Sequence, residues 1–260
     1  MKKVILLTAL MLTALAARAE YTLKYSPDQA TTTTQVQFRP EVGLNKHFGN
    51  HASLRLTEEV RLNTTGFKRA DTHLSFRYRF NRYVRLGAGY TFRLAQGTKR
   101  LKTFHRLNVS AAASIKAHRW KFTLQEKPIF LIRGDSINSV EKNRVDIGLR
   151  HKLTIEYNIR HRPLKTYASI EVGNTLNAKS ISGTDGTNTY TWKGNYIDKI
   201  RPTIGLKWTV GRMHELNFYY VYDYDYERDY NITKNKHKLE VTRETTNTHA
   251  IGIAYVFDLK

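Results

Sequence analysis

The sequence feature that most constrains the fold is an alternation of apolar and polar residues with a period of two, which recurs from about residue 35 to residue 259. In 52–62, for example, Leu54 and Leu56 alternate with Arg55. Successive side chains of a β-strand point to opposite faces of the sheet, so this period predicts strands with one apolar and one polar face. The helical period of 3.6 residues does not compete in any of these segments. The chain is therefore predicted to be all-β.

Short and long connections alternate between the predicted strands, which run to about ten to thirteen residues. Strands of this length cross a bilayer at a tilt, whereas strands of a soluble β-sandwich usually have about five or six residues. Because lipid offers no hydrogen bonds to open sheet edges, we expect an antiparallel transmembrane β-barrel with short periplasmic turns and long outer loops. A secreted β-sandwich is the alternative. The expected short turns lie at 49–50, 81–82, 116–118, 158–163 and 211–214, and the expected long loops at 63–70, 95–102, 134–143, 177–196 and 227–247.

The number of strands follows from the need to close the barrel. Eleven strands are counted along the alternating region, and a weaker candidate precedes them, in 21–25 or in the threonine run 31–34. Bacterial outer-membrane barrels nearly always have an even number of strands, with both termini in the periplasm. We therefore expect about twelve strands, with ten as the alternative.

The first residues have the layout of a secretory signal peptide. Two lysines follow the initial methionine, residues 4–17 are almost wholly apolar, and Ala-Arg-Ala at 17–19 fits a small-x-small cleavage site. A membrane anchor is the alternative for this segment. We expect a signal peptide at 1–19, a single barrel at 20–260, and a location in the bacterial outer membrane.

Composition excludes several classes of protein. The chain has no cysteine, which rules out a disulfide scaffold, a cysteine-ligated metal and a thiol nucleophile. Its formal net charge of +21 suggests nucleic acid, but export from the cell argues against that partner. Aromatic residues make up 12% of the chain, more than a disordered chain would contain. We expect a folded protein that does not bind nucleic acid.

The C-terminal strand carries a more specific signal. Gly252, Tyr255 and Phe257 form a Gly-x-x-aromatic-x-aromatic pattern, which resembles the signal that delivers outer-membrane barrels to their insertion machinery. The pattern departs from that signal because Asp258-Leu259-Lys260 follows it. The resemblance implies the insertion machinery as a partner, beside outer-membrane lipids and lipopolysaccharide.

Several short runs resemble a known family of barrels. The chain is similar to the domain-of-unknown-function 2490 (DUF2490) family of Bacteroidetes-type bacteria, which shows Glu-x-Arg and Arg-x-Arg strands followed by a Gly-x-Gly-Tyr strand. That resemblance implies an outer-membrane barrel but no established activity. A looser likeness, in size, strand rhythm and inward arginines, links the chain to twelve-stranded porins for acidic oligosaccharides. The runs that carry the family resemblance are Phe38-Arg-Pro-Glu41, Glu58-Glu59-Val-Arg61, Phe76-Arg77-Tyr78-Arg79-Phe80 and Gly87-Ala-Gly-Tyr90.

Basic side chains recur on the polar face of the predicted strands, which would line the lumen. Arginine offers a planar fork of donors that matches carboxylates and phosphates, and apolar walls focus the field of such charges. We expect a basic lumen that acts as a passive channel or binding cavity for small anionic solutes, such as anionic oligosaccharides. The alternative is a plugged structural or surface-interaction barrel, whose arginines pair with its own carboxylates. The candidate residues are Arg55, Arg61, Arg77, Arg79, Arg85, Arg93, Arg106, Lys121, Arg144 and Arg150.

Signals of catalysis are missing from the sequence. It contains no Gly-x-Ser-x-Gly elbow, no His-Glu-x-x-His motif, no phosphate-binding loop and no calcium-binding loop. We therefore expect no enzyme activity, no cofactor and no metal. A lipid-modifying outer-membrane enzyme with a Ser–His pair is a remote alternative.

Overall fold

The computed structural model describes residues 22–25, 29–97, 101–133, 145–184, 187–211, 213–233 and 238–259. The expected signal peptide, the expected loop 134–143 and Arg144 lie outside the described residues. No described residue belongs to a helix long and apolar enough to cross a membrane.

Fourteen strands make up the regular structure of the described residues. They are β1 (Thr22–Tyr25), β2 (Gln29–Phe48), β3 (Ala52–Asn63), β4 (Gly66–Arg79), β5 (Val84–Gln96), β6 (Leu101–Ala117), β7 (Trp120–Arg133), β8 (Val145–Asn158), β9 (Leu164–Thr175), β10 (Ile181–Thr184), β11 (Thr189–Trp192), β12 (Ile197–Val210), β13 (His214–Thr233) and β14 (Lys238–Leu259).

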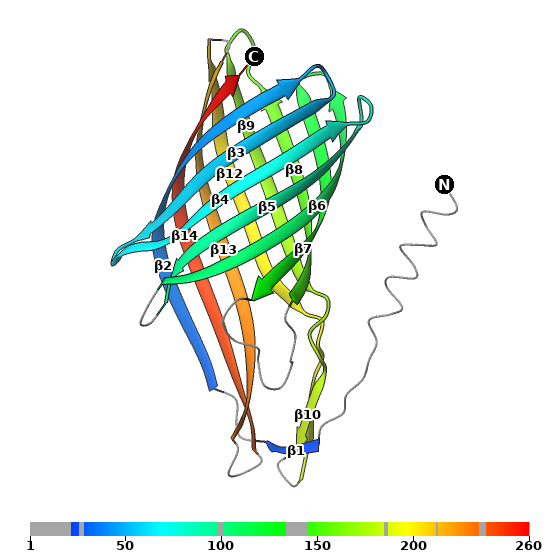
Figure 1. The fold of residues 1–260 in the computed structure, drawn as a ribbon, viewed down its shortest axis with the longest axis vertical. Helices are drawn as coiled ribbons and strands as arrows, with labels where there is room; N and C mark the ends of the chain where they lie inside the picture. Colours follow the sequence, from blue (N-terminus) through cyan, green and yellow to red (C-terminus); the bar gives the residue numbers. More distant parts are fainter. Residues whose placement is uncertain are drawn as a thin grey trace, which may run out of the picture.

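Eleven of the described strands form one closed barrel (Figure 1). Strands β2 to β9 follow one another around it, β12, β13 and β14 continue it, and each neighbouring pair in this series is antiparallel. The barrel closes where β14 pairs with β2 in parallel, from Thr242 opposite Gln29 to Leu259 opposite Lys46. The expectation of an all-β barrel is thus confirmed, while the strand number is eleven and not twelve or ten.

The parallel closure explains the odd number. Strands β2 and β14 run in the same direction, and an antiparallel closure would need a twelfth strand between them; their direct pairing makes that strand unnecessary. The candidate at 21–25 does form a strand, β1, but this pairs with β10 and with the start of β14 outside the barrel. The threonine run 31–34 is part of β2.

The two ends of the barrel differ, and we call them the short-turn end and the long-connection end. The short-turn end holds the connections after β2, β4, β6, β8 and β12, as expected, together with the last described residues. At the long-connection end several expected loops are strands instead. The expected loop 227–247 lies in β13 and β14 except for 234–237, which are not described, and the expected loop 177–196 contains β10 and β11. The expected loop 63–70 shrinks to a turn at 64–65, and in 95–102 strand β5 continues to Gln96 and β6 begins at Leu101.

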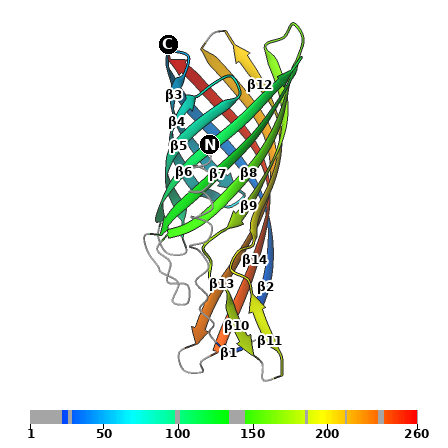
Figure 2. The same cartoon turned by 90° about the vertical axis from the view of Figure 1, so that its right-hand side faces the viewer.

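These longer strands form an extension beyond the barrel (Figure 2). The extension consists of the outer parts of β2, β13 and β14 with β1, β10 and β11 beside them. A small apolar core holds it together, made of Ile181, Tyr230, Leu239 and Val241 with Trp192 packed against them. Burial of these side chains explains why segments that resemble polar loops in sequence are extended and paired.

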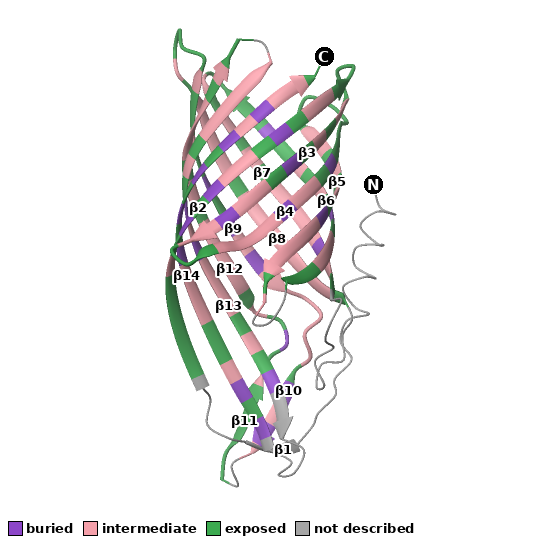
Figure 3. Cartoon of the chain, turned by 60° about the vertical axis from the view of Figure 1, so that its left-hand side comes forward, coloured by how far each residue is buried: buried purple, intermediate pink, exposed green. Residues whose placement is uncertain are grey.

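The outer face of the barrel is apolar and the lumen is polar, as the period-two pattern requires. Large apolar side chains such as Leu56, Phe76 and Ile204 are exposed, whereas Arg39, Arg61 and Asp71 are buried. Figure 3 shows exposed, intermediate and buried residues interspersed along the strands of the barrel. Exposed apolar side chains in such number are typical of surfaces that contact a membrane or another protein. Aromatic side chains are exposed near the short-turn end: Phe48, Phe80, Tyr83, Trp120 and Trp208.

Two tyrosines occupy the lumen near the short-turn end, and each lies against a glycine. Tyr167 is opposite Gly205 and Tyr219 is opposite Gly252 in the strand register. A Cβ built on Gly252 would lie 2.0 Å from Cζ of Tyr219, and one built on Gly205 would lie 2.6 Å from the ring of Tyr167. Only glycine lets these rings lie flat against the neighbouring strand.

Replacing Gly252 with alanine should therefore displace the Tyr219 ring and lower the free energy of unfolding by about 1–3 kcal/mol, the usual cost of overpacking. Urea unfolding of the purified barrel would measure this loss. In a Tyr219→Ala background the same substitution should cost less than about 0.5 kcal/mol, because the clashing ring is gone. Equal losses in both backgrounds would contradict the steric explanation.

Candidate functional site

A cavity of about 660 Å³ lies in the lumen. Its lining comes from β2 to β9, from β12 and β13, and from the chain around Asn177 and Tyr196. Because Thr175, Asn177 and Tyr196 lie where β9 ends and β12 begins, the cavity reaches the long-connection end. Tyr167 and Tyr219 are not among the described residues that line it, whereas Arg77 and Gly87, near the short-turn ends of β4 and β5, are.

Charges of both signs line the cavity. Among the described lining residues there are ten lysines and arginines and eight carboxylates, so the two signs nearly balance. The cations are Arg61, Arg69, Arg77, Arg93, Arg106, Lys127, Arg150, Lys199, Arg201 and Arg228, and the carboxylates are Glu41, Glu59, Asp71, Asp146, Glu171, Asp198, Asp225 and Glu227.

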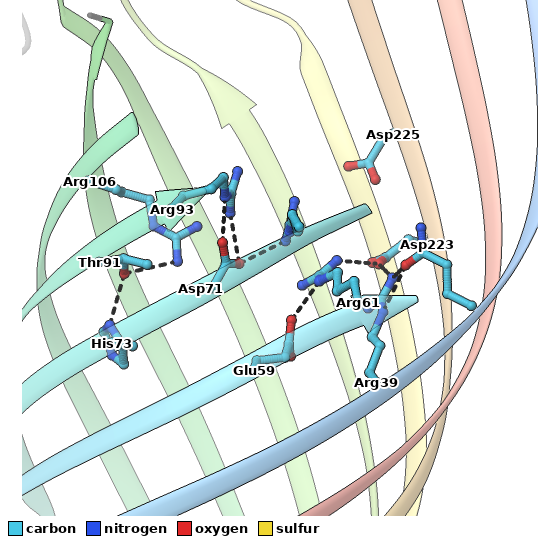
Figure 4. Close-up of polar contacts among 12 residues, drawn as sticks. Arg39, Glu59, Arg61, Asp71, His73, Thr91, Arg93, Arg106, Asp223 and Asp225 are labelled. Atoms are coloured by element: carbon cyan, nitrogen blue, oxygen red, sulfur yellow. Dashed lines mark hydrogen bonds and ion pairs between the residues drawn. The ribbon is translucent and has the colours of Figure 1, made fainter. Parts of the chain in front are cut away.

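The most deeply buried carboxylate beside this cavity belongs to Asp223 on β13, which is 1% exposed. Arg39 donates a hydrogen bond of 2.7 Å from Nη2 to Oδ2 of Asp223, and Arg201 donates one of 3.1 Å to the same oxygen (Figure 4). Arg61 Nη1 lies 3.9 Å and Lys199 Nζ 4.0 Å from the carboxylate. Four cations from β2, β3 and β12 therefore lie within 4.0 Å of this one carboxylate.

Other carboxylates of the lumen are engaged in the same way. Asp71 accepts hydrogen bonds of 2.7 and 3.2 Å from Arg93, and Arg69 Nη2 lies 3.1 Å away. Arg150 donates a bidentate pair of 2.7 and 2.8 Å to Asp198. These forked contacts fix each guanidinium in one orientation and leave little of the carboxylate for any further donor.

Three arginines of the lining keep an unused donor. The Nε atoms of Arg69, Arg106 and Arg228 are buried and have no hydrogen-bond partner among the described residues. Arg106 donates only from Nη2 to Oγ1 of Thr91, at 3.3 Å, and no described carboxylate lies within 4.0 Å of it. Arg228 donates to the carbonyl of Lys193 at 3.2 Å and lies over the ring of Tyr196. A buried donor without an acceptor is costly. The absence of a described carboxylate beside Arg106 leaves its charge available to an anionic occupant of the cavity.

The ten candidates from the sequence separate into three groups. Arg61, Arg77, Arg93, Arg106 and Arg150 line the cavity. Arg55, Arg85 and Lys121 do not line it; they contact Glu41 at 3.0 Å, Ser114 at 3.2 Å and Glu156 at 2.7 Å. Arg79 is exposed at the end of β4 and Arg144 is not described, so neither is placed at the cavity.

Sequence reasoning missed several residues of this site, above all Arg39, Arg69, Arg201 and Asp223. The signal that could have found them is the period-two alternation of apolar and polar residues. Asp223 belongs to a tyrosine-rich segment, and the period of two separates its odd-numbered positions from the outward tyrosines on either side. Tyrosines dominate the composition of this segment, so its composition does not single out Asp223.

Metal ligands are not assembled in the described part of the chain. No group of three or more His, Asp or Glu side chains there could hold a metal ion. His73 contacts Oγ1 of Thr91 at 2.9 Å and the carbonyl of Tyr90 at 3.1 Å. This ring is therefore oriented by the wall of the lumen.

One family model matches the chain, and it is described as "Protein of unknown function (DUF2490)". The match covers residues 29–234, which begin with β2 and extend to the end of β13. It confirms the resemblance that the Glu-x-Arg and Arg-x-Arg runs suggest. No curated protein matches the chain.

Proposed function

We propose that this chain, which belongs to the DUF2490 family, is a bacterial outer-membrane β-barrel that binds small anionic solutes in its lumen. The observation that carries the proposal is Arg106, which lines the cavity, donates only to Oγ1 of Thr91 and has no described carboxylate within 4.0 Å. An anion in the cavity would supply the counter-charge that the paired carboxylates of the lumen do not offer.

Support for the membrane comes from the outer face. Exposed apolar side chains surround a sheet that has no open edge around the barrel, as a lipid environment requires. The aromatic side chains near the short-turn end suit the headgroup region. With the expected signal peptide, this supports a short-turn end in the periplasm, a long-connection end outside the cell, and contacts with lipids and lipopolysaccharide.

A binding cavity fits the lumen better than an open channel. The cavity reaches the long-connection end, while Tyr167 and Tyr219 occupy the lumen near the other end. Long side chains readily fill a barrel of this size. We therefore propose that solutes enter from outside the cell and are held, and that passive conduction is slow unless these two rings move.

Binding of inorganic phosphate and of glucuronate to the purified barrel in detergent tests this function. Calorimetry should detect binding that weakens as salt is added, because the attraction is electrostatic. Arg106→Gln should lower the affinity at least about tenfold, since it removes a charged donor from the cavity. Arg79→Gln removes the same charge outside the cavity and should leave the affinity within about twofold.

Two results would count against the proposal. Absence of binding by the unmodified protein would favour a plugged structural barrel, whose ion pairs serve only its own stability. Equal losses in both variants would show that net charge alone attracts the anion.

A further inference from the structure

Within the described part of the chain, the outer face of the barrel carries an acid–base contact in the middle of its apolar surface. Nδ1 of His151 on β8 lies 2.5 Å from Oε2 of Glu126 on β7. The side chains are 38% and 44% exposed. Glu126 alternates with Gln125 and Lys127, which line the cavity, so its carboxylate points away from the lumen.

Apolar residues surround this pair along both strands. Polar groups are costly on a surface that faces lipid, and such groups mark functional positions. Strands β7 and β8 cross the near face of the barrel in Figure 2. The residues that alternate with the lumen side of these strands around the pair are Trp120, Phe122, Leu124, Pro128, Phe130 and Ile132 on β7, and Tyr157, Ile155, Leu153, Leu149 and Val145 on β8.

The neighbouring strands do not cover the pair. Ala111 of β6 lies opposite Glu126 and Ala113 lies opposite Leu124; both alanines are exposed and too short to shield the carboxylate. On the other side, Nδ2 of Asn174 lies 3.5 Å from Nε2 of His151, which is too long for a strong hydrogen bond. The carboxylate therefore keeps acceptor capacity that faces outward over the small side chains of β6, and the ring of His151 stays partly exposed beside it.

We infer that the face formed by β6 to β9 binds a second copy of this chain within the membrane, with Glu126 and His151 at the centre of the contact. The inference rests on the membrane placement proposed above but not on anion binding. In the register Glu126 and His151 lie side by side. When two such faces meet across a two-fold axis along the membrane normal, their left–right order is reversed, so the carboxylate of each copy meets the imidazole of the other.

Self-complementarity is what favours a second copy over another protein. The outer face of β3 also carries a carboxylate, Glu58, which accepts a hydrogen bond from Thr72 and has no basic side chain of the described residues within 4.0 Å. Two copies of that surface would bring acceptor against acceptor and repel each other. The β3–β4 face therefore provides a matched control for the β7–β8 face.

Cysteine cross-linking tests the inference without background, because the chain contains no cysteine. Leu124 and Leu153 are opposite each other in the register, and the two-fold axis would bring Leu124 of one copy to Leu153 of the other. Two copies with different tags, one Leu124→Cys and one Leu153→Cys, should form a mixed disulfide upon mild oxidation of outer membranes. The control pair is Leu56→Cys with Leu74→Cys, which is similarly exposed on β3 and β4. This pair should give at least about fivefold less mixed disulfide.

Substitution of the polar pair completes the test. Glu126→Gln or His151→Phe should lower the yield of the mixed disulfide at least about fivefold, while Glu58→Gln should leave it unchanged. Each variant is first checked for the heat-modifiable gel migration of a folded barrel. Equal cross-linking on both faces, no cross-linking, or an adduct with a different protein would overturn the inference. Recovery of the protein in the soluble fraction would overturn the membrane proposal as well, and loss of phosphate binding alone would leave the inference intact.

Discussion

Replacing Asp223 with asparagine should lower the free energy of unfolding by about 3–5 kcal/mol, the usual cost of removing one partner from a buried ion pair. The carboxylate is 1% exposed and accepts hydrogen bonds from Arg39 and Arg201. Arg61 and Lys199 lie within 4.0 Å of it. Without Asp223 these four cations would repel one another in a part of the lumen that water reaches poorly.

Reversible urea unfolding in phospholipid vesicles, monitored by tryptophan fluorescence, would measure this loss. Asp225→Asn is the matched control, because it lies two residues further along the lumen side of β13. Asp225 contacts Lys199 and is 44% exposed, so its loss should cost less than about 1 kcal/mol. Similar losses for both variants would show that Asp223 does not organise the lumen.

Removing the two lumenal tyrosines should open a path through the barrel. We expect the Tyr167→Ala, Tyr219→Ala double variant to conduct at least about ten times more current than the unmodified protein in planar bilayers, because pore width sets conduction. Both rings lie against glycines near the short-turn end and are not part of the cavity lining. The open path should prefer anions, since lining arginines such as Arg106 lack a carboxylate within 4.0 Å among the described residues.

Tyr220→Ala is the matched control for this experiment. Tyr220 is the next residue after Tyr219 on β13, but its side chain is exposed on the outer face. Its removal should leave the current unchanged. A current in the unmodified protein as large as in the double variant would refute the role of these rings as a barrier.

The alternation of residues was enough to predict the barrel and most of its strands. Leu54, Arg55 and Leu56 lie on the expected faces because the direction of a side chain from a strand depends only on local backbone geometry. The family match agrees with the short runs that suggested it. The number of strands was not predicted, because a parallel closure between β2 and β14 has no local signal.

The extension beyond the barrel was missed for a similar reason. The segments 177–196 and 227–247 are polar, and polarity without a strong pattern suggests loops. They become strands because Tyr230, Leu239 and Val241 meet Ile181 from a distant part of the chain. That small core cannot be recognised until the segments are placed together.

Of the candidate cavity, the sequence supplied the arginines but not their partners. The period of two determined by itself which face each residue occupies, because that choice is local and repeats every second residue. Only the tertiary structure decided that Asp223 meets Arg39, that Tyr219 lies on Gly252, and that Glu126 meets His151 on the outer face. These contacts depend on strand register and on the closure of the barrel, which bring together residues far apart in the chain. A local sequence pattern does not specify which distant residues will meet.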